Sequence, residues 1–322
     1  MSELLKNIDA RTKLAGTNKL EILLFFLGVD QRTGRRETYG INVFKVREVM
    51  RTPVITAAPD MPASVEGMVS LRGALVPVID LATYSGISPE TPREIMIVTE
   101  YNGHTQGFLV EGVDTILRLD WSKMRVPPEM LTSQTGGLVT AVTELDDGRL
   151  VMMMDVEKVL SETTSIDNEI MYRGVVAVDR PDSTVFYCDD SSVARKQIER
   201  TLSAMGVRGI SAVNGRQMWE QMEKVATYAQ SIGQPVSSMI SLVLTDIEMP
   251  EMDGYILTKS IKSDPRFSGI PVIMHSSLSG MSNQKLGVSV GVDEYVPKFE
   301  PLRLSETLAR RLGVDTVPVR AA

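Results

Sequence analysis

Five polar residues in the second half of the chain have the types that phosphoryl chemistry on a carboxylate requires. They are Asp189, Asp190, Asp246, Ser276 and Lys298. Three carboxylates brought together repel one another, and a hard cation with oxygen ligands, such as Mg²⁺, relieves that repulsion. A lysine and a hydroxyl at the same point would neutralise and hydrogen-bond an anion attached to one carboxylate. If the fold gathers them, these groups predict an aspartyl phosphate site with Mg²⁺ as its cofactor.

Short apolar strands are the elements expected to gather these residues. Each polar residue stands at or just beyond the end of a predicted strand, and the strands are residues 185–188, 240–244, 271–274 and 295–296. An amphipathic helix over residues 191–205 follows the first strand, and such alternation predicts a parallel sheet with helices on both faces. Sites in these sheets form beyond the carboxyl ends of the strands. Taken singly, each residue could be a helix cap, a turn hydroxyl or a solvated charge, and only their shared position favours a site.

The segment from residue 185 to about 313 resembles a response-regulator receiver domain. The resemblance rests on the five polar residues and on three further features, which are Met249-Pro250, Met252-Asp253-Gly254, and Tyr295 three positions before Lys298. It implies a flavodoxin-like α/β fold with a doubly wound parallel sheet. By the same resemblance Asp246 would be the phosphoryl acceptor, and Asp189, Asp190 and Asp246 would hold Mg²⁺ together with the main-chain carbonyl of Glu248.

The receiver resemblance also implies roles for the remaining site residues. Ser276 and Lys298 would bind the phosphoryl oxygens, and Tyr295 would be the aromatic switch that changes rotamer as Ser276 moves. Tyr295 could equally be an ordinary half-buried strand aromatic. Leu278, two positions after Ser276, would crowd the path of the hydrolytic water and slow loss of the phosphoryl group, or would simply pack within its loop.

One interval departs from the receiver pattern. The spacing between Asp190 and Asp246 is longer than is usual for the family, and we expect the excess between Tyr228 and Met239, where Gly233 and Pro235 indicate a loop.

The first half of the chain has short β-like segments without long helices between them. The predicted strands are residues 22–27, 75–79, 95–98, 107–110, 138–142 and 150–154. Asn102-Gly103 and Asp147-Gly148 tolerate positive φ in tight turns, so residues 94–110 and 138–154 are predicted hairpins. Many short strands of this kind predict a barrel or a sandwich. No catalytic group is recognisable here, which favours a binding scaffold.

Residues 19–162 resemble a CheW-type coupling domain. The resemblance rests on residues 39–41, 46–49, 65–73 and 76–81, above all on Leu71-Arg72-Gly73 and the Val-Pro-Val-Ile-Asp-Leu sequence that follows. It implies two small five-stranded barrels that bind chemoreceptor signalling tips and a CheA-type histidine kinase. Val46, Glu48 and Arg72 would face the receptor. Alternatively Val46 could belong to the core, and Arg72 could brace a loop through a salt bridge.

A coupling domain followed by a receiver resembles a CheV-type chemotaxis protein. We expect a multidomain chain with an N-terminal tail (1–18), a coupling domain (19–162), a linker (163–182), a receiver (183–315) and a C-terminal tail (316–322). The expected function is a non-enzymatic adaptor that joins receptors to the kinase and is regulated by phosphorylation of Asp246. The alternative is a phosphate sink that the first domain tethers at the receptor array.

Composition agrees with a protein-binding role. Among 322 residues, 41 acidic and 34 basic side chains give a net charge of −7, which disfavours nucleic acid as a partner. The best apolar run, residues 22–29, is too short to cross a membrane, so direct membrane insertion is not expected. A single cysteine, Cys188, suits a reducing compartment, and we expect a cytoplasmic protein associated with membrane receptor arrays.

Overall fold

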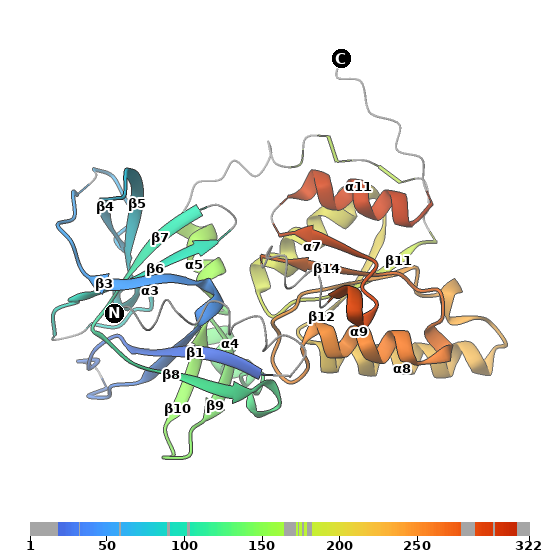
Figure 1. Cartoon of the computed structure of the whole chain (residues 1–322), viewed down its shortest axis with the longest axis horizontal. Coiled ribbons are helices and arrows are strands. Elements are labelled where there is room, and N and C mark those ends of the chain that lie inside the picture. The colour runs from blue at the N-terminus through green and yellow to red at the C-terminus, as the bar shows by residue number, and fades with distance from the viewer. Residues whose placement is uncertain are drawn as a thin grey trace. The chain divides into compact units, whose positions relative to one another are not determined.

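The chain forms two compact units, within Leu20–Ser165 and Ile166–Ala322. The structure, a computed structural model, describes residues 19–31, 33–57, 59–88, 91–101, 104–163, 172, 174–175, 177–178, 182–277, 287–298 and 300–313. Figure 1 shows the first unit in blue to green and the second in yellow to red. In the described part of the chain, no helix is long and apolar enough to span a bilayer.

The first unit contains two five-stranded sheets. One has the order β8-β1-β2-β10-β9, with β1 (Lys19–Phe26), β2 (Thr38–Asn42), β8 (Gly112–Asp120), β9 (Val139–Glu144) and β10 (Leu150–Met154). The other has the order β3-β6-β7-β5-β4, with β3 (Val46–Arg51), β4 (Val65–Leu71), β5 (Ala74–Asp80), β6 (Ile95–Tyr101) and β7 (His104–Val110). Two sheets of five strands confirm the expected CheW-like architecture.

Both predicted hairpins are present in the first unit. Strands β6 and β7 pair antiparallel, as do β9 and β10. The predicted Asn102-Gly103 turn lies outside the described residues. Short helices join the strands, namely η1 (Val43–Lys45), α3 (Leu81–Tyr84), η2 (Trp121–Lys123), α4 (Glu129–Gln134) and α5 (Val156–Thr163).

The two sheets and α5 share one core. Phe25 and Ile41 from the first sheet cluster with Ile97 and Phe108 from the second, and Val159 of α5 is buried among them. Burying apolar side chains from both sheets is what holds the sheets together, at about 25 cal/mol for each Å² removed from water. The last helix of the unit is therefore part of its core.

The second unit is a parallel sheet of order β12-β11-β13-β14-β15. Its strands are β11 (Thr184–Cys188), β12 (Arg208–Ala212), β13 (Leu242–Thr245), β14 (Val272–Ser276) and β15 (Glu294–Pro297). Every pairing is parallel. This is the 2-1-3-4-5 order of flavodoxin-like folds, so the predicted doubly wound fold is confirmed.

Helices cover both faces of this parallel sheet (Figure 1). On one face, α7 (Ser192–Met205) and α11 (Pro301–Arg311) bury Ile198, Leu202 and Leu308 against the strands. On the other, α8 (Gly215–Ser231) and α9 (Gly254–Ser263) bury Met222 and Leu257. Two single-turn helices, η3 (Val236–Ser238) and η4 (Pro265–Phe267), pack beside α8 and α9.

The long interval before Asp246 is only partly the loop that Gly233 and Pro235 suggested. Helix α8 runs to Ser231, because Ala226 and Ala229 continue its buried stripe at helical spacing. The predicted loop from Tyr228 to Met239 was thus too long, since its first residues are helical and the turn η3 interrupts the rest.

Part of the segment expected to be a linker packs onto the second unit. Val178 is buried in the core beneath α7, and its amide donates to the carbonyl of Met205 at 2.8 Å. Val175 packs against the same core, and the guanidinium of Arg200 lies 4.8 Å from the ring centre of Tyr172. These residues therefore add to the α7 side of the second unit.

Candidate functional site

The carboxyl ends of the parallel strands bring the predicted polar residues to one edge of the sheet. Asp189 directly follows β11, Asp246 follows β13, Ser276 ends β14, and Lys298 follows β15. The strand order places β12 on one side of β11 and β13 on the other, so the chain reverses its winding direction between β11 and β13. Ligand sites of open α/β sheets lie at such a reversal.

Lys298 is bound to two of the three carboxylates. Its Nζ lies 2.8 Å from Asp189 Oδ2 and 2.9 Å from Asp246 Oδ2. The lysine is only 1% exposed, and both aspartates are buried. Charges at such depth are tolerated when they are paired, so the ammonium and the two carboxylates stabilise one another.

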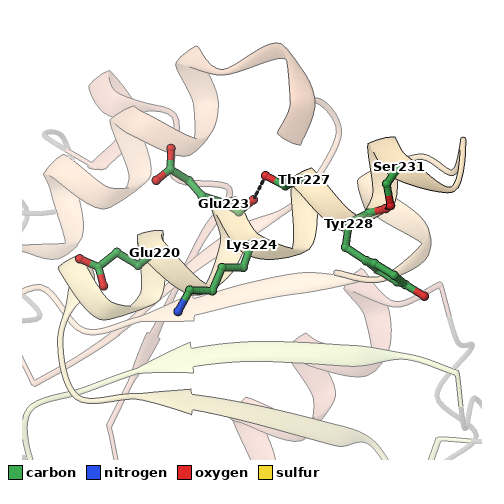
Figure 2. A pocket seen from close by; sticks show the side chains of 6 residues that line it. All are labelled: Glu220, Glu223, Lys224, Thr227, Tyr228 and Ser231. Atoms are coloured by element: carbon green, nitrogen blue, oxygen red, sulfur yellow. Dashed lines mark hydrogen bonds between the residues drawn. The ribbon is translucent and has the colours of Figure 1, made fainter.

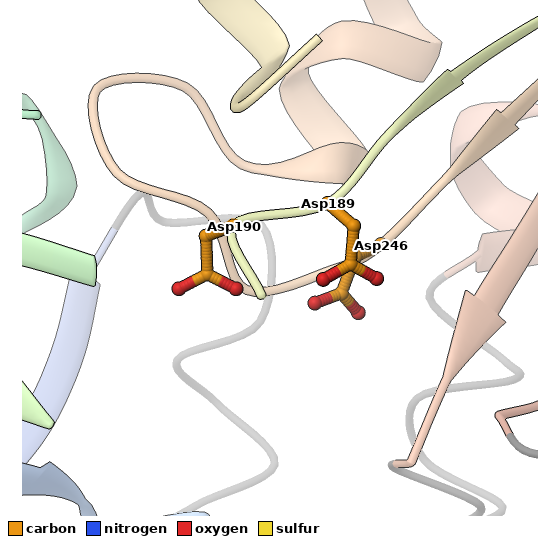
Figure 3. A group of neighbouring side chains, drawn as sticks. All are labelled: Asp189, Asp190 and Asp246. Carbon is orange, nitrogen blue, oxygen red and sulfur yellow. The ribbon is translucent and has the colours of Figure 1, made fainter. Parts of the chain in front are cut away.

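The third carboxylate completes a cluster that fits a hard cation. Asp189, Asp190 and Asp246 each offer an oxygen, and these oxygens lie within 4.8 Å of one another (Figure 3). Asp190 is the more exposed member, which leaves the cluster open on its side. An all-oxygen, anionic donor set is the kind that Mg²⁺ takes in proteins.

Backbone contacts fix the first two aspartates. The amide of Ser191 donates to Asp189 Oδ1 at 2.9 Å, and the hydroxyl of Ser191 caps α7. Arg195, one turn into α7, donates from Nη1 to the main-chain oxygens of Asp189 (2.6 Å) and Asp190 (3.0 Å). Arg195 therefore orients the loop that carries both carboxylates. The sequence analysis missed it, because nothing in a helical arginine indicates that it folds back onto the preceding loop.

The loop after Asp246 is closed by a tight turn and a glycine. Glu251 has φ +66°, and the amide of Met252 donates to the carbonyl of Pro250 at 2.7 Å. A Cβ on Gly254 would lie 1.9 Å from the carbonyl oxygen of Asp246, so no other residue fits there without moving the backbone. The first residue of α9 is thus held directly against the main chain of Asp246.

Three of the remaining predicted receiver residues are described, and they lie on or just after strands that lead to this cluster. Ser276 is buried at the end of β14, and its carbonyl accepts from the amide of Lys298 at 3.3 Å. Glu248 is buried two positions after Asp246. Tyr295 is half-buried on β15, and its hydroxyl lies 3.2 Å from that of Tyr255. Leu278 lies outside the described residues.

A surface depression of the second unit is separate from these residues. It is open, and all of its lining residues belong to α8, namely Glu220, Glu223, Lys224, Thr227, Tyr228 and Ser231 (Figure 2). None of the predicted site residues lines it.

In the first unit, two of the predicted receptor-facing residues, Arg72 and Glu48, form an ion pair, and the third, Val46, contacts the core. Arg72 Nη2 lies 2.9 Å from Glu48 Oε2, and the Arg72 side chain is 70% exposed. Arg72 and Gly73 form the two-residue turn between β4 and β5, with φ of +50° and +84°. Val46 is half-buried and packs against the core that both sheets share. Arg72 thus makes a salt bridge and still presents its guanidinium to solvent.

Comparisons with known proteins divide the chain in the same way. A family model described as "CheW-like domain" matches residues 24–164, and one described as "Response regulator receiver domain" matches residues 185–309. The chain is 28% identical to "Chemotaxis protein CheV3" of Helicobacter pylori over 301 residues, covering 92% of this chain and 95% of that protein.

Two other relatives match shorter parts of the chain. "Chemotaxis protein CheW" of Klebsiella aerogenes is 32% identical over 163 residues, which are 49% of this chain and 93% of that protein. "Chemotaxis protein CheY1" of Helicobacter pylori is 34% identical over 129 residues, 39% of this chain and 94% of that protein.

Proposed function

This chain belongs to the CheV-type chemotaxis proteins, and from that premise we propose that it couples chemoreceptors to a CheA-type histidine kinase under control of phosphorylation at Asp246. At the coarser level, it is a chemotaxis adaptor with a receiver domain. We propose in addition that the partners are chemoreceptors and a CheA-type kinase, that Asp246 is the phosphoryl acceptor, and that the protein lies at the membrane receptor arrays. We also propose domain limits of 19–162 and 183–315, with residues 163–182 between them, of which Val175 and Val178 pack onto the second unit.

The observation that carries the phosphorylation proposal is the cluster of Asp189, Asp190 and Asp246, two of whose carboxylates, those of Asp189 and Asp246, are paired with Lys298. An oxygen of Asp246 would attack the phosphorus of a phosphodonor, and the bond to the donor's leaving atom would break, with its electron pair leaving on that atom. Lys298 lies within hydrogen-bond distance of the acceptor carboxylate. Its ammonium could therefore bind and neutralise the phosphoryl oxygens once the group is transferred to Asp246. Ser276, at the neighbouring strand end, would donate a further hydrogen bond.

Asp189, Asp190, Asp246 and the main-chain carbonyl of Glu248 would hold Mg²⁺. When bound, the ion supplies positive charge to the carboxylates and to the incoming phosphoryl group. The chain itself holds the ligand Asp189 in place, because Ser191 donates to its carboxylate and Arg195 donates to its main-chain oxygen. Because the phosphoryl group ends on the protein itself, we propose a regulated adaptor and not an enzyme with a separate substrate.

The test is a reconstitution of receptor membranes, a CheA-type kinase and this protein, with kinase autophosphorylation as the readout. We expect a phosphodonor to change kinase output with the wild-type protein and to have no effect with Asp246→Asn, which cannot form the acyl phosphate. Asp182→Asn, which removes an exposed aspartate, is the matched control and should behave as wild type. If wild type drains phosphoryl groups but leaves kinase output equal to that of Asp246→Asn, the protein is a phosphate sink.

Arg72→Glu is expected to weaken attachment to receptor membranes by roughly tenfold, equivalent to about 1.4 kcal/mol. The reversal removes an exposed guanidinium and sets two carboxylates side by side at Glu48. Sedimentation with receptor membranes measures attachment, and labelling of Asp246 by acetyl phosphate should be unchanged. The double variant Glu48→Arg/Arg72→Glu restores an ion pair without restoring the original surface. If the double variant sediments as wild type, or if Arg72→Glu does, Arg72 only braces its loop.

A further inference from the structure

Two tyrosines from different elements meet beneath the acceptor loop of the second unit. Tyr255 is the second residue of α9, and Tyr295 is the second residue of β15. Their hydroxyl oxygens lie 3.2 Å apart, within hydrogen-bond distance. Both pack in a small apolar cluster with Ile247 and Met274. The pair therefore joins α9 to β15 across the end of β14.

The α9 end of this pair is fixed to Asp246. Gly254 lies against the Asp246 carbonyl so closely that a Cβ would be 1.9 Å from it, and the Gly254 amide donates to the carbonyl of Ile247 at 2.9 Å. Tyr255 is the next residue and is buried. A shift of the acceptor loop must therefore move the main chain to which the Tyr255 ring is attached.

The β15 end of the pair rests on a glycine. A Cβ on Gly287 would lie 2.5 Å from both the Cε2 and the hydroxyl oxygen of Tyr295. Contacts under 3 Å do not occur between such atoms, so the Tyr295 ring occupies the space that a side chain at position 287 would fill. The half-buried position of Tyr295 thus depends on a residue without a side chain.

Both hydroxyls remain protonated over the ordinary pH range. Burial, the largest cause, raises the pKa of Tyr295 to about 12, and burial also raises the pKa of Tyr255 well above its usual value. Each hydroxyl can therefore donate or accept. A hydrogen bond between two partly desolvated hydroxyls contributes to stability, because breaking it removes a partner from each of the two polar atoms.

We propose that Tyr255 is a positioning residue of the receiver, whose hydroxyl holds Tyr295 over Gly287 and so connects the Asp246 loop to β15. Loop movement would be passed to β15 through this bond, in addition to any route through Ser276. As regulation, the proposal rests on phosphorylation of Asp246. The position of Tyr295 without a phosphodonor, however, can be measured whether or not Asp246 is phosphorylated.

The experiment uses the full chain with ¹³C at the ε positions of its tyrosines, of which there are eight. The Tyr295 resonance is assigned from Tyr295→Phe, and its exposure is read from relaxation caused by a neutral, soluble gadolinium chelate. Tyr255→Phe, which removes only the hydroxyl, is expected to lower the ratio of packed to exposed Tyr295 by about two- to tenfold. Gly287→Ala should displace the ring by collision and have a larger effect.

Tyr228→Phe is the control, because it removes a hydroxyl from an exposed tyrosine of the same unit. Thermal unfolding of each variant shows whether it is folded, and Tyr255→Phe remains decisive if Gly287→Ala is not. Equal Tyr295 relaxation in Tyr255→Phe and Tyr228→Phe would overturn the inference. Absence of acetyl phosphate labelling in the wild-type chain would instead overturn the proposed function and leave this result standing.

Discussion

Acetyl phosphate is expected to label Asp246 when Mg²⁺ is present and to fail when divalent cations are chelated. Three carboxylate oxygens lie within 4.8 Å of one another, Lys298 pairs with only two of these carboxylates, and phosphorylation brings a further negative group. At an effective dielectric constant of about 20, two unit charges at that separation repel by about 3 kcal/mol. Without a cation, that repulsion alone predicts a drop of at least about a hundredfold in labelling rate.

Labelling is measured with radioactive or mass-resolved acetyl phosphate in matched buffers that differ only in Mg²⁺ and chelator. Asp246→Asn in Mg²⁺ sets the background, and circular dichroism in chelator shows whether the fold persists without the ion. Full labelling in excess chelator, at the wild-type rate, would show that the carboxylate cluster is not a cation site.

Lys298→Met is expected to destabilise the receiver by about 3–5 kcal/mol in chelator, the usual cost of removing one partner of a buried ion pair. The variant leaves the buried carboxylates of Asp189 and Asp246 without their ammonium. Mg²⁺ can neutralise the same carboxylates, so we expect it to restore a substantial part of the loss. Urea unfolding of the full chain, followed in chelator and in Mg²⁺, measures both effects.

Lys259→Met is the matched control, because Lys259 is exposed on α9. Its free energy of unfolding should change by less than about 0.5 kcal/mol and should not depend more on Mg²⁺ than that of wild type. The prediction for Lys298 is contradicted if the two variants unfold alike in chelator. Labelling of Lys298→Met by acetyl phosphate should be low even in Mg²⁺, since no ammonium then reaches the phosphoryl oxygens.

The sequence predicts the carboxylate cluster well because its members obey a topological rule. Asp189, Asp246 and Lys298 each stand at the end of a buried apolar strand, and parallel strands place those ends at one edge. The residues that orient the cluster obey no such rule. Arg195 folds back from a helix onto main-chain oxygens, and Tyr255 has the appearance of a core aromatic. Only the three-dimensional contacts distinguish Arg195 from an ordinary helical arginine, and Tyr255 from an ordinary core aromatic.

The predicted strands leave out β2, β3, β4, β8 and β12, and a weak pattern explains only part of this, since every residue of β2 is buried. Strand β8 (Gly112–Asp120) has no fully buried residue, so neither alternation nor an apolar run marks it. In α8 the opposite error occurred, because Gly233 and Pro235 suggested a loop that began too early. Glycine and proline indicate that a helix ends nearby. The buried alanines at helical spacing show where α8 actually ends.

The turn at Arg72 combines a backbone conformation that lowers the stability of the fold with a side chain that we propose binds the receptor. A side chain at φ +50° costs roughly 1–2 kcal/mol in the left-handed region, and a two-residue turn of this kind favours asparagine or glycine. An exposed ion pair such as that with Glu48 returns only about 0–1 kcal/mol. Selection for a stable fold alone would therefore replace this arginine. Efforts to stabilise the protein at that turn would remove the very guanidinium that we propose meets the receptor.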